Sequence, residues 1–137
     1  PLRILLTALP AAGFAFFGVQ KFGAENAVFA YLAEQSGIGL FEPLVRYATG
    51  VAELLAAALI LAGLFVPKLR GLGGLLGLAI VGGAIVLHLT PWLGVNAPVA
   101  FDETGEYVRS PFLFFTALGL AALTAGQVVF ERLTSRG

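Results

Sequence analysis

Three residues with reactive side chains lie inside apolar runs or at their ends. Glu53 lies within GVAELLAAALILAG (residues 50–63), while Lys21 and His88 lie near the ends of two other apolar runs. A carboxylate in hydrocarbon costs roughly 2.5–3.5 kcal/mol even on lenient insertion scales, so acids inside membranes are rare and usually functional or paired. A carboxylate can accept or relay a proton, and an ammonium or imidazole group can hydrogen-bond a carbonyl oxygen. The pattern predicts either a polar ligand site with Glu53 as its catalytic group or a structural ion pair.

Helical spacing indicates which way these side chains point. Small residues share a face with Glu53 in one segment and with His88 in another, namely Thr49, Gly50 and Ala57, and Gly73, Gly77 and Ala84. Small residues on such faces let helix backbones approach closely in lipid, so we expect both side chains to point into a bundle. Phe14, Phe17 and Lys21 form one stripe of the first segment and would supply a wall of the same cavity.

Three more residues are predicted to bind a ligand there. Gln20 is next to Lys21, and Trp92 follows the third segment as an interfacial aromatic anchor. Arg46 lies two helical turns before Glu53 on the same stripe, so Lys21 and Arg46 are both cationic partners for this acid, with Lys21 preferred. Taken singly, Lys21 and Arg46 also suit ordinary interfacial residues whose long side chains reach water.

The composition indicates an integral membrane protein. Of 137 residues, 58% are hydrophobic and 12% charged, and the mean hydropathy is +0.93, well outside the soluble globular norm. Eight basic and eight acidic residues cancel, so no general positive field favours nucleic acid. Without cysteine the chain itself cannot perform thiol chemistry, and the sequence shows no zinc-type or calcium-loop spacing, so no metal site is predicted.

Four apolar segments of about 20 residues are each long enough to cross a hydrocarbon core of about 30 Å. They cover approximately residues 2–22, 44–66, 69–89 and 111–130. The sequence therefore predicts an all-α membrane protein, a four-transmembrane-helix bundle in a single domain over residues 1–137.

The two longer loops carry structure of their own. Asn26 is a suitable N-cap for a short interfacial helix over Ala27–Ser36, which Gly37 would end, and this helix is expected to lie along the membrane surface. The alternating stretch Ala97–Arg109 around Gly105 predicts a small hairpin. The hairpin would cover the mouth of the bundle.

Basic residues near the segment ends predict the orientation. They form two groups, Arg3, Lys68, Arg70, Arg132 and Arg136 on one side and Lys21, Arg46 and Arg109 on the other. Because cytoplasmic loops carry the excess of lysine and arginine, both termini are predicted to be cytoplasmic, with the two longer loops outside.

Several stretches together resemble the DoxX family of small four-helix membrane proteins. These are FFGVQKF (16–22), GVAELLAAALILAG (50–63) and LFVPKLRGLGGLLGLAIVGGAIVLHL (64–89), and the similarity covers about residues 3–90. Its most specific elements are the Gly18 and Lys21 pair, the adjacent Glu53 and Leu54, and Gly63 close to a basic turn.

The resemblance implies a bacterial inner-membrane protein. Members of the family are associated with thiosulfate:quinone oxidoreduction and with membrane complexes that handle thiol and oxidative stress, while many have no assigned activity. Since this chain lacks cysteine, it would act as a quinone-linked subunit with a partner, in a larger membrane complex or a homo-oligomer in contact with lipid.

The first hypothesis for its function is binding of a quinone or a small polar ligand in a cavity of the outer leaflet. Lys21 and His88 would hydrogen-bond carbonyl oxygens, Glu53 would handle protons, and Phe14, Phe17 and Trp92 would flank the ring. The alternative is a non-catalytic structural or assembly subunit, in which the charged contacts only fix helix register. A carrier is disfavoured because the sequence shows no clear inverted repeat and no broken midspan helices.

Overall fold

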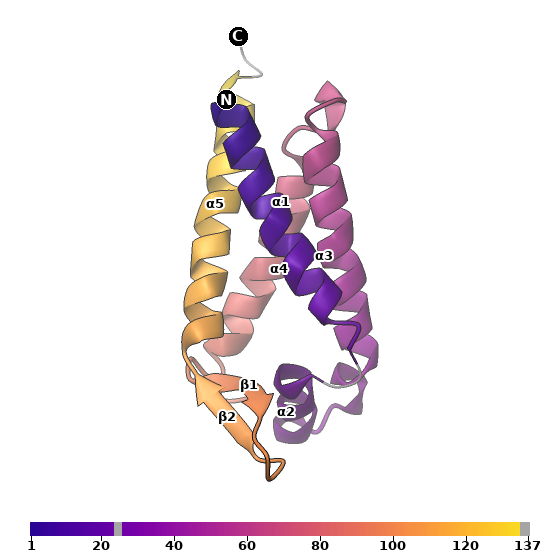
Figure 1. Ribbon diagram of the computed structural model, residues 1–137, viewed down its shortest axis with the longest axis vertical. Helices are drawn as coiled ribbons and strands as arrows, with labels where there is room; N and C mark the ends of the chain where they lie inside the picture. The colour runs from indigo at the N-terminus through magenta and orange to yellow at the C-terminus, as the bar shows by residue number, and fades with distance from the viewer. Residues whose placement is uncertain (24–25, 135–137) are drawn as a thin grey trace.

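Four long helices form the body of the molecule. The structure, a computed structural model, describes residues 1–23 and 26–134, and within these residues four helices are long and apolar enough to cross a membrane. They are α1 (Leu2–Gln20), α3 (Leu44–Ala62), the segment Pro67–His88, which ends with α4 (Leu72–His88), and α5 (Phe112–Thr134). Figure 1 shows α1 crossing the bundle obliquely, with the start of α1 and the end of α5 at the same end. The predicted four-helix bundle is confirmed.

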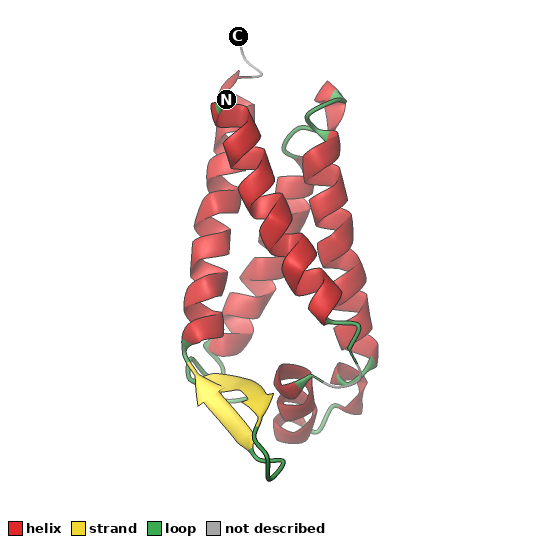
Figure 2. Ribbon diagram, viewed as in Figure 1, coloured by secondary structure: helices red, strands yellow, loops and turns green. Residues whose placement is uncertain are grey.

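The two ends of the bundle differ in construction. The terminal end, where α1 begins and α5 ends, also holds the short 3-10 helix η2 (Pro67–Leu69) that joins α3 to α4. The hairpin end holds α2 (Ala27–Ser36), the 3-10 helix η1 (Gly39–Phe41) and the strands β1 (Ala97–Phe101) and β2 (Tyr107–Ser110). Figure 2 shows these small elements below the long helices.

Glycines permit a close crossing of α1 and α3. A Cβ atom on Gly50 would lie 2.7 Å from the Cβ of Lys21, and one on Gly18 would lie 3.2 Å from the Cβ of Glu53. Real Cβ contacts are almost never as short as the one at Gly50 and are seldom as short as the one at Gly18, so a larger residue at Gly50 would force the helices apart. The absence of side chains at Gly18 and Gly50 brings Lys21 and Glu53 together.

Two further glycines do the same for α4. A Cβ on Gly73 would lie 2.5 Å from the backbone nitrogen of Ile60, and one on Gly77 would lie 2.6 Å from the ring of Phe14. Phe14 is completely buried and belongs to the central core. The small-residue face predicted for the third segment therefore packs within the chain, against α3 and α1.

The short helix α2 has the ends that the sequence predicts. The side chain of Asn26 accepts a hydrogen bond from the backbone N–H of Phe29, and Gly37 ends the helix with φ of 74°. Its buried residues Phe29 and Leu32 pack with Leu93 and Ala97. The apolar face of α2 thus covers the bundle and β1 instead of lying only on lipid.

The predicted hairpin is also present. β1 and β2 pair antiparallel, with Ala100 opposite Val108 and an irregularity between Pro98 and Ala100. It is held to α2 by a hydrogen bond of 2.7 Å from Arg109 to the hydroxyl of Tyr31. The hairpin and α2 therefore form one cover at this end of the bundle.

Candidate functional site

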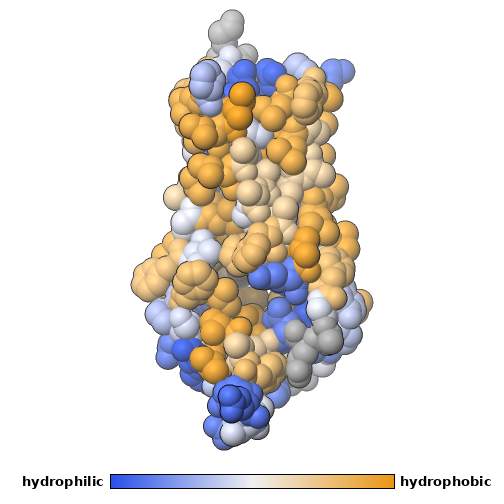
Figure 3. All heavy atoms as spheres, in the orientation of Figure 1, coloured by the Kyte–Doolittle hydropathy of each residue, from blue (hydrophilic) through white to orange (hydrophobic). Residues whose placement is uncertain are grey.

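A cavity of about 780 Å³ occupies the half of the bundle nearest the hairpin. The helices α1, α3, α4 and α5 form its walls, while α2 and the hairpin region close it from below. Figure 3 shows the molecule hollowed below the end of α1, with hydrophilic residues on one rim of the opening. The lining is mostly apolar, and its polar or charged residues are Gln20, Lys21, Asn26, Thr49, Glu53 and His88.

Glu53 and Lys21 form an ion pair in the wall of this cavity. The Nζ of Lys21 lies 3.0 Å from Oε1 of Glu53, and the two side chains are 14% and 9% exposed. The same Nζ donates a hydrogen bond of 3.2 Å to the backbone oxygen of Phe17 and lies 5.8 Å from the centroid of its ring. The pairing of Glu53 with Lys21 predicted from the sequence is confirmed.

The pair leaves hydrogen-bonding capacity unused. The contact between Nζ and Oε1 has the distance of an ion pair without the alignment of a hydrogen bond, and this buried oxygen has no donor among the described residues. An ionised carboxylate oxygen can accept several hydrogen bonds. Oε1 of Glu53 therefore keeps unused acceptor capacity beside Lys21.

His88 is the last residue of α4 and also lines the cavity. Its Nδ1 lies 2.9 Å from the backbone oxygen of Gly94. Because a carbonyl oxygen can only accept, Nδ1 carries the proton, and in the neutral ring Nε2 is left as an acceptor. Nε2 has no hydrogen-bond partner among the described residues. Neutral His88 can therefore accept a hydrogen bond from a ligand in the cavity, but it cannot donate one to a carbonyl oxygen, the role predicted from the sequence.

Arg46 lies elsewhere, and it is not the second cation beside Glu53. Its Nε donates to Glu42 at 2.7 Å, while its Nη1 donates to the backbone oxygens of Lys21 at 2.8 Å and Gly23 at 2.6 Å. Side chains on a helix lean toward its N-terminus, so Arg46 reaches back one turn to Glu42 and away from Glu53. Arg46 is not in the cavity lining, and it fixes the chain that follows α1.

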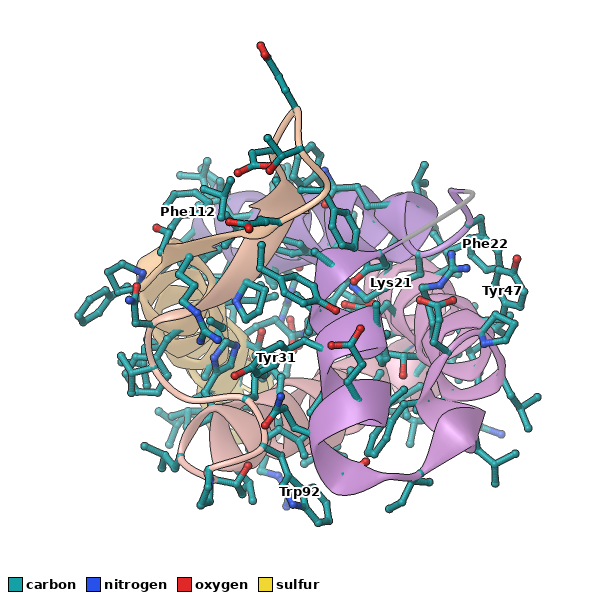
Figure 4. The ribbon with its side chains drawn as sticks, turned by 90° about the horizontal axis from the view of Figure 1, so that it is seen from below. Lys21, Phe22, Tyr31, Tyr47, Trp92 and Phe112 are labelled. Atoms are coloured by element: carbon teal, nitrogen blue, oxygen red, sulfur yellow. The ribbon has the colours of Figure 1, made fainter. Side chains whose placement is uncertain are left out.

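The structure brings together some of the remaining predicted residues and not others. Phe14, Phe17 and Gln20 line the cavity beside Lys21. Trp92 is 39% exposed, packs edge to face on Phe41 at 6.5 Å and is absent from the lining. Figure 4 shows Lys21 near the middle of the view and Trp92 at its margin.

The floor of the cavity was not predicted from the sequence. Phe29 and Leu32 of α2 and Leu93 line it, and Asn26 and Thr49 add polar atoms. The buried stripe of the short helix was visible in the sequence, but the element on which it packs is distant along the chain. No local pattern reveals that contact.

A second buried acid lies at the terminal end. Glu131 is 4% exposed, and its Oε1 accepts a hydrogen bond of 2.9 Å from Nε of Arg3. The fourth segment predicted from the sequence ends at residue 130, which left Glu131 outside it. In the structure α5 continues to Thr134, so Glu131 lies inside the helix.

Comparison with known protein families shows where this chain belongs. A family model described as the DoxX-like family matches residues 5–102, more than half of the chain. No curated protein and no solved structure matches. The matched range runs from α1 through β1 and includes Lys21, Glu53 and His88. Together with its four membrane-crossing helices, this match shows that the chain is a multi-pass membrane protein that belongs to the DoxX-like family.

Proposed function

We propose that this DoxX-like protein is a membrane subunit that binds a quinone head group in the cavity at the hairpin end and acts with an electron-donating partner. The observation that carries the proposal is an ion pair, Lys21 with Glu53, in the wall of a mostly apolar cavity. Sites for small molecules are typically roughly 300–1,000 Å³, apolar, with a few placed polar groups. The cavity of about 780 Å³ has these properties.

The polar groups match the two oxidation states of such a ligand. The ammonium group of Lys21 is a donor for a carbonyl oxygen of the oxidised form, and Glu53 accepts or relays the protons that accompany reduction. Nε2 of neutral His88 is an acceptor for a hydroxyl group of the reduced form. Phe17, whose ring lies near Nζ of Lys21, provides a surface for the ring of the ligand.

The electrons would come from a partner. The chain has no cysteine, so a thiol or a sulfur compound would be oxidised on another subunit of a larger membrane complex, or by a separate donor. The hairpin and α2 provide the exposed surface at the mouth of the cavity where such a partner would dock. A homo-oligomer is the alternative assembly.

The proposed location is the bacterial inner membrane with both termini cytoplasmic. Among the described residues, Arg3, Lys68, Arg70 and Arg132 belong to the terminal end. This excess supports a cytoplasmic terminal end by the positive-inside rule. Arg136, which the sequence analysis counted on the same side, lies outside the described residues.

The single tryptophan provides a test of quinone binding. Trp92 precedes Leu93, which lines the cavity, so we expect saturable quenching of its fluorescence when decylubiquinone is added to protein in lipid nanodiscs. Phe17→Ala should weaken binding roughly fivefold, since an aromatic pair contributes about 1 kcal/mol. Phe16→Ala is the matched control, because Phe16 is 60% exposed and absent from the lining. Equal fluorescence quenching curves for Phe17→Ala and Phe16→Ala would contradict the proposal.

A second candidate function is a structural or assembly subunit without a ligand. The hydrogen bonds of Arg46 to the backbone of Lys21 and Gly23 favour this structural function. In them the guanidinium group only holds the chain between two helices in place. In that case the ion pair of Lys21 and Glu53 would set helix register. Non-saturable quenching in the wild type, together with loss of a co-purifying partner when residues 99–108 are deleted, would support this function instead.

A further inference from the structure

A second, smaller cavity lies at the terminal end, at the opposite end of the bundle from the proposed quinone site. Its volume is about 440 Å³, and its charged lining consists of Arg3, Arg70, Arg132 and Glu131. Figure 3 shows hydrophilic residues gathered at this end above an apolar belt. We propose that this cavity binds the phosphate group of an anionic phospholipid.

The charges of the cavity favour an anion. Arg3 pairs with Glu131 at 2.9 Å and donates to the hydroxyl of Thr134 at 3.0 Å, so the one acid is already neutralised. Arg70 donates through Nε to the backbone oxygen of Gly63 at 2.8 Å, and no carboxylate pairs with it among the described residues. A guanidinium group has five N–H donors in a planar fork, so Arg70 keeps donors for a phosphate.

The start of α4 adds to this field. Gly71 and Leu72 line the cavity, and they are the N-cap and the first residue of α4. No side chain caps the helix there. The first backbone N–H groups of a helix lack partners within it and carry partial positive charge, which favours a phosphate.

Apolar residues beside the arginines indicate a lipid and not a free anion. Leu72 and Leu75 line the cavity, are 49% and 43% exposed, and begin the apolar surface of α4. A phosphate held by Arg70 would place the acyl chains of the same molecule along this surface. Basic cavities between membrane helices are suited to acidic lipid head groups for this reason.

Native mass spectrometry provides the test. The full chain in detergent would be incubated with phosphatidylglycerol or phosphatidylcholine with identical acyl chains. We expect the wild type to retain phosphatidylglycerol roughly fivefold more, and Arg70→Gln to remove this preference, since one arginine near the surface contributes about 1 kcal/mol. Arg109→Gln at the hairpin end should behave as the wild type.

Arg70→Lys separates charge from structure. This variant removes the hydrogen bond from Nε to Gly63 but keeps the positive charge, so we expect it to retain most of the preference for phosphatidylglycerol. Loss of preference in Arg70→Lys and Arg70→Gln with equal loss of thermal stability would overturn the proposal, because it would assign Arg70 to the turn alone. Equal retention of both lipids by the wild type would also overturn it. So would equal thermal stabilisation by inorganic phosphate at the same concentration, which would indicate a free anion.

Discussion

At the scale of single residues, the protein places an acid where only a paired acid is tolerated. Glu53 has Lys21 at 3.0 Å, yet one of its oxygens has no hydrogen-bond donor among the described residues. A carboxylate used only for structure would gain from a full set of donors, since unsatisfied buried polar groups destabilise the fold. This oxygen is buried beside Lys21 in the wall of the cavity, so substitutions of Glu53 test whether the carboxylate serves only the fold.

Glu53→Ala and Glu53→Gln should differ in their effects on stability and on ligand binding. Removing one partner of a buried pair typically costs about 3–5 kcal/mol, so Glu53→Ala should lower the free energy of unfolding in detergent substantially. Lys21 is at the end of α1 and partly exposed, so we expect the loss in free energy of unfolding for Glu53→Ala to lie near the lower end of this range. Glu53→Gln keeps the shape and one acceptor oxygen but removes the charge and the proton exchange.

For Glu53→Gln we expect a folded protein whose affinity for decylubiquinone is about tenfold lower, since hydrogen bonds to charged groups contribute about 1.5–3 kcal/mol. Chemical denaturation and fluorescence titration measure the two quantities. Unchanged affinity in a folded Glu53→Gln variant would remove Glu53 from the ligand site and leave only its structural role.

At the scale of elements, the crossing of α1 and α3 determines whether this pair exists. Gly50 is the point of contact, because a Cβ there would lie 2.7 Å from the Cβ of Lys21. Gly50→Ala should force α1 outward, lengthen the contact between Lys21 and Glu53, and destabilise the protein by roughly 1–3 kcal/mol, the usual cost of overpacking. Gly82→Ala is the control: no atom lies within 4 Å of the added Cβ, and it should be neutral or stabilising. Thermal unfolding of both variants in the same detergent is the measurement.

The hairpin turn should be sensitive to acid. Oδ1 of Asp102 accepts hydrogen bonds from the hydroxyl and backbone N–H of Thr104 and from the backbone N–H of Glu106. These bonds, the one from the hydroxyl of Thr104 first, hold the pKa of the Asp102 carboxyl below its ordinary value. A depressed pKa means that the carboxylate stabilises the turn above the unfolded pKa, about 3.9, and that this contribution is lost as pH falls through the folded pKa.

Hydrogen exchange of the amides of Thr104 and Glu106 checks this expectation. Their protection should decrease below about pH 4, while Asp102→Asn, which keeps an acceptor oxygen but cannot titrate, should show lower protection with no such step. A step of the same size in the Asn variant would assign the acid sensitivity to another group.

At the scale of the whole molecule, local patterns in the sequence were sufficient to predict the helices and the hairpin. They were not sufficient to predict the contacts between these elements. Asn26 and Gly37 mark the ends of α2 because capping depends on neighbours in the chain. Arg46 was misplaced because helical phase gives the face of a side chain but not whether it extends toward water or into the bundle. The floor made by α2 was missed because it depends on contacts distant in the sequence.

The proposed topology can be tested with single cysteines, since these 137 residues contain none. Thr104→Cys in the hairpin turn should react with a membrane-impermeant maleimide added to intact cells. Lys68→Cys in η2 should react only after the inner membrane is permeabilised, because the terminal end is proposed to be cytoplasmic. The reverse labelling pattern would invert the orientation and place the cavity of Lys21 on the cytoplasmic side.

The two ion pairs of α1 have a consequence for biogenesis. α1 is synthesised before its partners, and it contributes a cation at each end: Lys21 for Glu53 of α3, and Arg3 for Glu131 of α5. Until α3 and α5 have both been synthesised, one or both of these cations lack a counter-charge. The nascent bundle is then incomplete at one end or at both. Release of the chain from the insertion machinery into lipid would therefore be most favourable after α5 has been synthesised. At that point the last turns of α5 reach Arg3 and the four-helix bundle is complete.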